Sequence, residues 1–498
     1  MSEGEVFVRA ARGAGALSAQ NAINALLGLV FFMVFARVVS KAEMGAYGAV
    51  YLILSVLIIV GNFGLGFAAS HFLPFYYGRN EAGRMLTVSK RIFMLSLIFG
   101  IVLLVASLIL ADLFSLLLLG TTGYGFLFRI TAVAVFAGVL GFTFDGFLRG
   151  LQKFNSLALY RLLSQALRVG VSIGLLLLGF GVAAVFIGWI VFYVALSILA
   201  AILTIRILLG MRRENSNLNV VDNPFPFKAI FGFSAPMMVF QLVTYLSDSI
   251  DRYVVLGLLG TEPLGVYTVV LTAASSIGMI LIMPLLSTLI PSMSEVYGRV
   301  GAEKLSEVFR LSSRYISLIF IPACFGFAVL SPLALRILAG SAYVEAALPL
   351  AIVAVGMGAY GFSAALLSSL TALGKTLRIA LAVLLASFIE FVLCFLMVPW
   401  FGVTGAALGR ALTYIVMFGL LVFFGSKFMA ISVDCEAALK SGFASAVMGL
   451  IVYCLAFFTN YRLIMLPLYL TVGIVSYVLF LILLKALKTA DVQFFKKI

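Results

Sequence analysis

Residues 232–267, GFSAPMMVFQLVTYLSDSIDRYVVLGLLGTEPLGVY, form an apolar stretch long enough to cross a bilayer as a helix. Its second half nevertheless carries Asp248, Asp251 and Arg252. A charged side chain near the centre of a membrane helix costs about 2.5 to 3.5 kcal/mol on insertion scales, so such residues usually have a partner or a function. The stretch therefore predicts a membrane-spanning helix whose charges need one of these two explanations.

The composition of the whole chain points to the same class of protein. Of its 498 residues, 64% are hydrophobic and 10% are charged, whereas soluble globular proteins are about half apolar and about a quarter charged. The apolar runs are about 20 residues or longer and lack strand-like alternation, so helices rather than a β-barrel must satisfy the backbone. The sequence predicts an all-α polytopic membrane protein and excludes a soluble one.

Fourteen apolar runs are candidate spans. They lie near 16–39, 46–72, 92–119, 127–148, 159–179, 182–208, 230–259, 264–290, 312–332, 347–371, 378–398, 403–424, 441–459 and 463–485. A polar, proline-containing stretch, 211–227, is typical of a linker. We expect an N-terminal six-helix bundle (1–209), a cytoplasmic linker (210–229), a C-terminal six-helix bundle (230–425), and two additional helices with a cytoplasmic tail (426–498).

The distribution of Lys and Arg predicts the orientation. Of the 33 basic residues, 25 lie in one set of loops and ends, 5 in the opposite set and 3 inside spans. Because cytoplasmic loops are enriched in Lys and Arg, we expect both termini in the cytoplasm, in agreement with an even number of spans. The net charge of +14 is then a topology signal, with attraction to anionic lipids as a secondary effect and no nucleic-acid partner expected. The N-terminal sequence leads directly into a full-length span, so we expect no cleaved signal peptide.

The chain also repeats itself. The segments 45–47 (GAY) and 265–267 (GVY) are 220 residues apart, and 151–153 (LQK) and 373–375 (LGK) are 222 apart. Six spans separate each pair, so the two halves should insert with the same orientation, as parallel repeats around a central cavity.

Several of these residues resemble a known family. Pro236 near the start of the seventh span, Asp251-Arg252, Gly265-x-Tyr267 and the segment 149–154, RGLQKF, look like the polysaccharide-repeat-unit flippases. These belong to one superfamily with the multidrug extruders and the peptidoglycan-precursor flippases. The resemblance covers about residues 15–485 and implies alternating-access movement of a polyprenyl-(pyro)phosphate-linked oligosaccharide from the cytoplasmic to the outer leaflet of the cell membrane. The implied partners are the lipid-linked oligosaccharide, membrane lipids and glycan-assembly proteins, around a monomeric transporter.

Such a carrier needs a hydrophilic lumen and basic groups for the phosphate. Gln20 and Asn24 share one face of the first span, and Arg161, Gln165 and Arg168 follow one stripe of the fifth. We take these five residues as candidates for substrate binding. Two interpretations of Arg168 stay open, a cavity residue or a member of a buried ion pair.

The remaining intramembrane charges have both structural and functional interpretations. Asp248 and Arg252 have the spacing and order of a favourable i, i+4 pair, which leaves Asp251 to a basic residue from another helix or to a burial-raised proton affinity. Glu390 and Arg410 lie at matching depths on neighbouring antiparallel spans, so we predict an interhelical salt bridge. As functional candidates, Arg252 would contact substrate, and Asp251, Asp248 and Glu390 would couple transport to H⁺ or Na⁺.

Other function classes find little support. The segment 369–376 ends in GKT but has Ser369 where a nucleotide-binding loop needs its first glycine, and a single histidine excludes most metal sites. The four cysteines have no metal or disulfide spacing. We expect no cofactor and no enzymatic activity. A cation-coupled multidrug extruder, with an acidic aromatic cavity, is the main alternative. A membrane-embedded glycosyltransferase or glycan polymerase is a further one, although the outer loops are too short for a catalytic domain.

Overall fold

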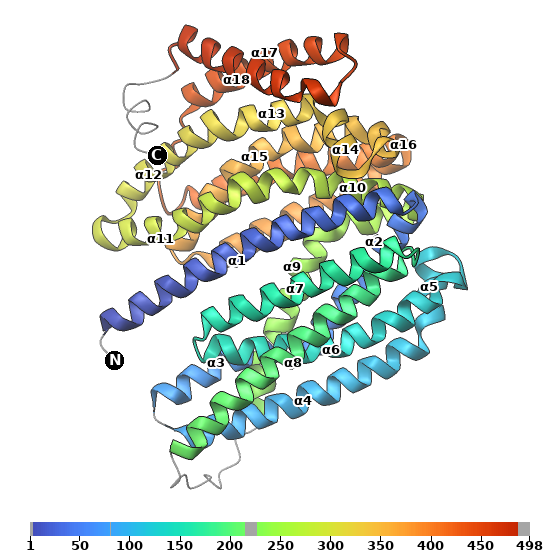
Figure 1. Ribbon diagram of the computed structural model, residues 1–498. Coiled ribbons are helices and arrows are strands. Elements are labelled where there is room, and N and C mark those ends of the chain that lie inside the picture. Colours follow the sequence, from blue (N-terminus) through green and yellow to red (C-terminus); the bar gives the residue numbers. More distant parts are fainter. Residues whose placement is uncertain (1–2, 80, 215–226, 487–498) are drawn as a thin grey trace. The chain divides into compact units, whose positions relative to one another are not determined.

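Helices form every regular element of the part of the chain that the computed structural model describes, residues 3–79, 81–214 and 227–486 (Figure 1). Each of the predicted spans coincides with helix, and 11 stretches of these residues are long and apolar enough to cross a membrane. One of those stretches, Thr376–Gly425, contains two predicted spans. The prediction of an all-α, multi-pass membrane protein is confirmed, with the count of fourteen as an approximate one.

The chain forms two compact units, Met1–Ser249 and Ile250–Ile498, so the division falls within one helix, α9 (Phe227–Leu259). Most of the predicted linker lies outside the described residues. The predicted domain boundaries at 209, 229 and 425 therefore stay predictions.

The first unit consists of eight helices and the beginning of α9 among its described residues. These are α1 (Glu3–Val38), α2 (Lys41–Asn62), α3 (Leu65–Gly78), α4 (Ala82–Ile109), α5 (Ala111–Leu119), α6 (Gly125–Gly150), α7 (Phe154–Leu177) and α8 (Ala183–Glu214). Ser40 begins α2 with a capping box, in which its hydroxyl accepts from the Glu43 N–H and the Glu43 carboxylate accepts from the Ser40 N–H.

The second predicted span is broken in the middle. Phe63 and Gly64 adopt φ values of 48° and 71°, and they separate α2 from α3. A Cβ at Gly64 would lie 2.3 Å from the carbonyl oxygen of Ser234 on α9, so only glycine permits this approach. The sequence analysis took this run as one span, although Asn62 and the glycines at 61, 64 and 66 are a local turn signal within it.

Close backbone contact joins α3 to α6. A Cβ at Gly146 would lie 2.1 Å from the carbonyl oxygen of Gly66, and one at Gly66 would lie 2.7 Å from that of Phe142. Such small residues are the usual means by which membrane helices approach closely. The contact holds the second half of the second predicted span against the fourth.

The second unit contains the rest of α9 and the helices that follow. They are α10 (Thr261–Ile277), α11 (Met283–Val300), α12 (Ala302–Tyr315), α13 (Ile321–Val329), α14 (Ser331–Ala339), α15 (Ala347–Ala372), α16 (Thr376–Gly425), α17 (Cys435–Phe458) and α18 (Leu466–Leu483). Two π-helical turns interrupt them, at Gly278–Ile282 and Ile316–Phe320. Gly402, with φ 56° and ψ −136°, bends α16 between the two spans predicted there.

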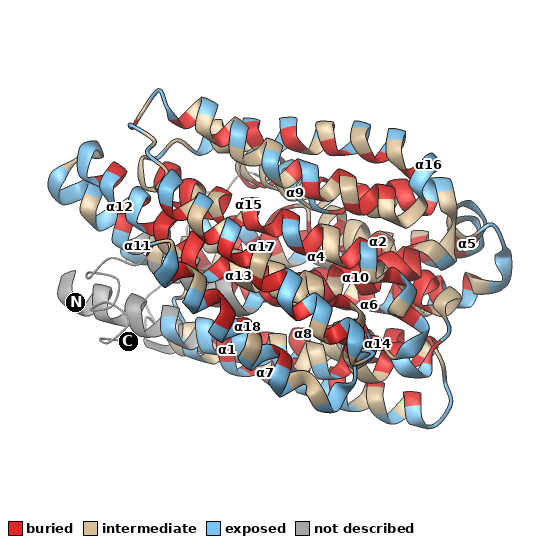
Figure 2. Cartoon of the chain, turned by 90° about the horizontal axis from the view of Figure 1, so that it is seen from above, coloured by how far each residue is buried: buried red, intermediate tan, exposed pale blue. Residues whose placement is uncertain are grey.

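Many residues of α16 are exposed (Figure 2), and large apolar side chains are among them. Phe388, Leu396 and Trp400 are all exposed in the isolated chain. Soluble monomers rarely expose such a continuous apolar surface. In a bilayer the same surface contacts lipid tails.

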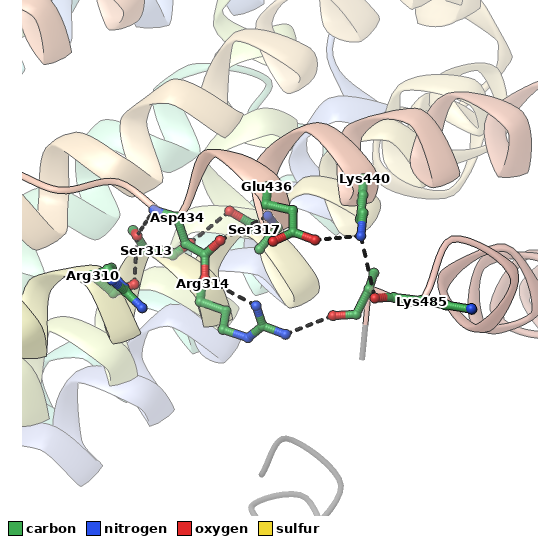
Figure 3. Close-up of polar contacts among 10 residues, drawn as sticks. Arg310, Ser313, Arg314, Ser317, Asp434, Glu436, Lys440 and Lys485 are labelled. Atoms are coloured by element: carbon green, nitrogen blue, oxygen red, sulfur yellow. Dashed lines mark hydrogen bonds and ion pairs between the residues drawn. The ribbon is translucent and has the colours of Figure 1, made fainter. Parts of the chain in front are cut away.

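The two additional helices, α17 and α18, pack against α13 and are fastened at one end by polar contacts (Figures 1 and 3). The Arg314 guanidinium donates to Asp434 at 3.1 Å and to the carbonyl oxygen of Ala486 at 2.7 Å. The Asp434 backbone N–H donates to the Ser313 hydroxyl at 3.1 Å, and its carboxylate caps α17 by accepting from the Ala437 N–H. Arg314 is only 5% exposed, so this cluster anchors both helices to α12.

Candidate functional site

The polar stripe predicted on the fifth span lies on α7, which packs between α1 and α8. Gln165 and Arg168 are buried, at 9% and 5% exposure, and the Arg168 side chain donates to the Gln165 amide oxygen at 3.1 Å. A buried arginine needs compensating contacts. The stripe therefore faces neighbouring helices of the first unit rather than lipid.

Aromatic rings supply the other contacts of Arg168. Its guanidinium carbon lies 4.8 Å from the ring centre of Phe31 and 4.5 Å from that of Trp189. Cation–π contacts of this length stabilise a cation at a desolvated position. Among the described residues, Arg168 forms no ion pair with a carboxylate, so its charge is balanced by ring faces and an amide.

A continuous array of rings surrounds this arginine. On α2, the ring centres of Tyr47 and Tyr51 lie 5.9 Å apart. The ring centre of Trp189 on α8 lies 5.4 Å from that of Tyr51 and 5.5 Å from that of Tyr193. The sequence analysis missed these rings, although each helix carries its pair at i, i+4 spacing. In apolar spans that spacing is common in ordinary helix packing, so it is a weak signal of function.

Gln20 and Asn24 lie on α1, which packs against α7. Their side-chain oxygens are buried and have no hydrogen-bond partner within the described part of the chain, and the same holds for Trp189 Nε1. Buried polar atoms normally find a partner, and exceptions indicate water, an ion or a ligand. The α1–α7–α8 region is therefore a polar site with unused donors and acceptors, and its role in substrate binding stays a prediction.

Arg161 has a different environment from the rest of the stripe. Its Nε and Nη2 both donate to the carboxylate of Asp145 on α6, each at 2.7 Å. Arg149 approaches the same carboxylate through Nε at 2.7 Å. In the sequence, Asp145 and Arg149 have the i, i+4 spacing that predicts a helical ion pair, and this pair is present. Arg161 joins it from across the turn between α6 and α7, and spacing within one helix could not predict that partner.

A second charged cluster lies in the second unit. Arg410 of α16 contacts Glu390 of the same helix, across the bend, at 2.8 Å and Asp251 of α9 at 3.7 Å. Tyr267 of α10 donates to Asp251 at 2.6 Å. The predicted Glu390–Arg410 salt bridge is confirmed. Of the two explanations offered for Asp251, the structure supports a basic residue from another helix.

Asp248 and Arg252 lie on either side of the division within α9. Asp248 is exposed, and Arg252 is partly buried with its backbone N–H donating to Asp251 at 2.8 Å. Their predicted mutual pair, the substrate contact of Arg252 and the ion-coupling role of Asp248 stay predictions.

An apolar cavity of about 570 Å³ opens in the second unit. It lies between α13 and α14 on one side and α17 and α18 on the other, and its walls include Phe327, Leu333, Met448 and Ile474. A hydrocarbon chain is the chemistry that such walls accommodate. Among the described residues, no three His, Cys, Asp or Glu side chains come together as metal ligands.

Comparisons with known proteins fit this architecture. The family model of the polysaccharide biosynthesis proteins matches residues 34–348. The fold is similar to that of the lipid II flippase MurJ in an inward closed conformation, with 16% identity and a TM-score of 0.71 over 93% of this chain and 97% of that one. It is also similar to an inward-facing multidrug resistance MATE family transporter of the MOP superfamily, with 18% identity and a TM-score of 0.66 over 81% of this chain and 94% of that one.

A MOP superfamily transporter from Pyrococcus furiosus is a third similar structure, with 16% identity and a TM-score of 0.56 over 83% of this chain and 95% of that one. At these identities the likeness concerns the fold. A comparison with curated protein sequences found no significant match. The family model covers well over half of the sequence and confirms the resemblance noted in the motifs. The chain belongs to the family of polysaccharide biosynthesis proteins.

Proposed function

We propose that the protein is a flippase that moves a polyprenyl-(pyro)phosphate-linked oligosaccharide from the cytoplasmic to the outer leaflet of the cell membrane by alternating access. The observation that carries this proposal is the match of the polysaccharide biosynthesis family over residues 34–348 on a fold shared with the lipid II flippase MurJ. The step is translocation and requires no covalent chemistry.

The contents of the first unit support an anionic, sugar-bearing substrate. Arg168 is a buried cation without a carboxylate partner in the described chain, so it can donate to a phosphate or carboxylate oxygen without first breaking an ion pair. The partly exposed rings of Tyr51 and Trp189 beside it present faces on which the C–H groups of a sugar ring can stack. The side-chain oxygens of Gln20 and Asn24, which have no partner in the described chain, can accept hydrogen bonds that sugar hydroxyls donate.

The second unit supports a lipid-linked substrate. Its apolar cavity of about 570 Å³ has walls suited to part of a polyprenyl chain. A lipid-linked sugar needs a polar environment for its glycan and phosphate and an apolar environment for its polyprenyl chain, because burying the polar part among apolar groups is costly. The two units between them provide both kinds of surface.

The multidrug extruder remains the alternative, since MATE transporters share the fold. An extruder of organic cations needs a carboxylate free to meet the drug. Here Asp145, Asp251 and Glu390 each contact an arginine within 4 Å. This arrangement favours an anionic substrate over a cationic one.

Coupling to H⁺ or Na⁺ through Asp251 and Glu390 is part of the proposal. Arg410 is shared by these two carboxylates, so the three side chains together carry one net negative charge when all are ionised. Binding of a proton or a cation would lower that charge. We also propose cytoplasmic termini, a monomeric transporter and contact with glycan-assembly proteins.

The test is translocation by the purified protein in proteoliposomes, with a fluorescent polyprenyl-diphosphate oligosaccharide and a membrane-impermeant quencher. Arg168→Ala should lower the apparent affinity about ten- to a hundred-fold, because a hydrogen bond to a charged group contributes about 1.5 to 3 kcal/mol. Arg206→Ala, which removes an exposed arginine from α8, is the matched control and should leave transport unchanged. Absence of translocation by the wild-type protein, together with efflux of organic cations, would replace the flippase by the extruder.

A further inference from the structure

Asp145 is the centre of a hydrogen-bond cluster at the end of α6. The Tyr160 hydroxyl donates to its Oδ1 at 2.6 Å, Arg161 donates to both oxygens at 2.7 Å, and Arg149 Nε meets Oδ2 at 2.7 Å. Four donors therefore converge on one carboxylate that is 2% exposed. A carboxylate offers about four lone-pair sites, so Asp145 has no capacity for another donor.

The charges of this cluster do not balance. One carboxylate faces two guanidinium groups, which leaves one net positive charge. The two arginines also differ in access to solvent, because the Arg161 side chain is 22% exposed and that of Arg149 is 46% exposed. Arg149 meets Asp145 through Nε. The excess charge is thus presented mainly by Arg149.

Arg149 lines a cavity of about 170 Å³ within the first unit. The cavity lies between α2, α3, α6 and α9, and its other polar side chains are Asn62, Ser70, Gln241 and Asp145, the last with its carboxylate held by the two arginines and Tyr160. The Asn62 amide nitrogen donates to the carbonyl oxygen of Val139 and to the Thr143 hydroxyl, and its oxygen accepts from the Gly66 N–H. These hydrogen bonds hold the cavity wall in place. The Ser70 hydroxyl donates to the carbonyl oxygen of Phe67, so Gln241 is the side chain that can turn a donor toward a guest.

The size and rigidity of the cavity restrict that guest. At about 170 Å³, the cavity is smaller than the pockets of about 300 to 1,000 Å³ that hold drug-sized ligands, so it suits a group of phosphate size. Gly66 and Gly146 both line it and hold α3 and α6 in backbone contact, so the walls cannot spread apart without breaking that contact. A guest must therefore be small and anionic.

We propose that this cavity is an anion site for a phosphate or diphosphate group, bound by Arg149 with Arg161 and Asp145 behind it. Asp145 fixes the two guanidinium groups in place and, being saturated, does not compete for the guest. Two sources share the chemistry, the diphosphate of a lipid-linked substrate and the headgroup of an anionic membrane lipid. The substrate diphosphate as the source rests on the proposed flippase function. In that case the cavity binds the diphosphate at the cytoplasmic end of the transport path.

Binding is tested with the full chain in nanodiscs of zwitterionic lipid, with farnesyl diphosphate as the probe and farnesol as its uncharged counterpart. The wild-type protein should bind the diphosphate and discriminate against farnesol. Arg149→Gln should weaken diphosphate binding about ten-fold, in line with the loss of one charge-assisted contact. Arg79→Gln removes an exposed arginine from the end of α3 and should leave the affinity unchanged. Ser70→Leu fills the cavity without changing the charge and should also weaken binding.

The arms of the experiment separate the possible outcomes. Competition by phosphatidylglycerol in the nanodisc would identify a membrane-lipid headgroup as the guest, and its absence would identify the prenyl diphosphate. Equal losses in Arg149→Gln and Arg79→Gln, or full affinity in both Arg149→Gln and Ser70→Leu, would overturn the site. Arg149-dependent binding in a protein that translocates no lipid-linked sugar would leave the site intact and refute the flippase function instead.

Discussion

Arg410 is the residue whose removal should have the largest effect on the stability of the second unit. Its side chain is 16% exposed and lies beside two buried carboxylates, Glu390 at 2.8 Å and Asp251 at 3.7 Å. Arg410→Met keeps much of the side-chain volume but deletes the one guanidinium that faces both carboxylates. Tyr267 and the Arg252 N–H still donate to Asp251, but they carry no full positive charge to Glu390.

The expected cost follows from what the substitution leaves behind. Removing one partner of a buried ion pair costs about 3 to 5 kcal/mol, mostly because the other charge stays buried without compensation. Here two carboxylates, Asp251 and Glu390, lose the same guanidinium, so Arg410→Met should lower the free energy of unfolding by about 3 to 5 kcal/mol. Adding Glu390→Gln removes one of the two, and the double variant should therefore be more stable than Arg410→Met alone, by about 1 to 2 kcal/mol.

Equilibrium unfolding in mixed micelles with increasing dodecyl sulfate measures these differences for the wild type, both single variants and the double variant. Lys427→Met, which removes an exposed positive charge just after α16, is the control and should lie within about 0.5 kcal/mol of the wild type. A double-mutant cycle whose coupling is below about 0.5 kcal/mol would refute the reasoning, since it would mean that Arg410 and Glu390 act independently.

Three further predictions concern other parts of the chain. Gly146→Ala should destabilise the protein by about 1 to 3 kcal/mol, because the new Cβ would clash with backbone atoms of Gly66. Gly170→Ala, which adds a Cβ in open space on α7, should leave the stability unchanged, and thermal unfolding of the two variants measures the difference. Arg314→Met should loosen α17 and α18, and hydrogen exchange should rise in those two helices while the rest of the chain keeps its protection. Collapsing the H⁺ and Na⁺ gradients across proteoliposomes should slow transport by the wild-type protein and have no effect on transport by an Asp251→Asn variant. Wild-type transport at the same rate with and without the two gradients would exclude coupling.

Some contacts of the candidate site followed from the sequence because they depend on depth alone. Glu390 and Arg410 stand at similar distances from the turn between two antiparallel spans, so their depths match whatever the helices around them do. The i, i+4 spacing of Asp145 and Arg149 likewise requires only a helix. Both pairs are present.

Other contacts depended on the rotation of one helix against another, which hydropathy does not encode. Arg161 and Arg168 belong to one stripe of α7, yet Arg161 turns to Asp145 while Arg168 lies between Phe31 and Trp189. The two arginines are seven positions apart, which is about 10 Å along the axis at 1.5 Å per residue, so their side chains meet different neighbours. Packing therefore split a set that the sequence grouped together.

By itself, the sequence determined that this chain is a helical membrane protein of the polysaccharide biosynthesis family, because apolar length, the bias of Lys and Arg and short motifs are local properties. Only the tertiary structure decided which charges are paired, where the spans break and which cavities exist. The break at Phe63–Gly64 and the cavity beside Arg149 arise where backbones approach through glycines. Such approaches depend on residues far apart in the chain, and so do the free energies of the charges that they bring together.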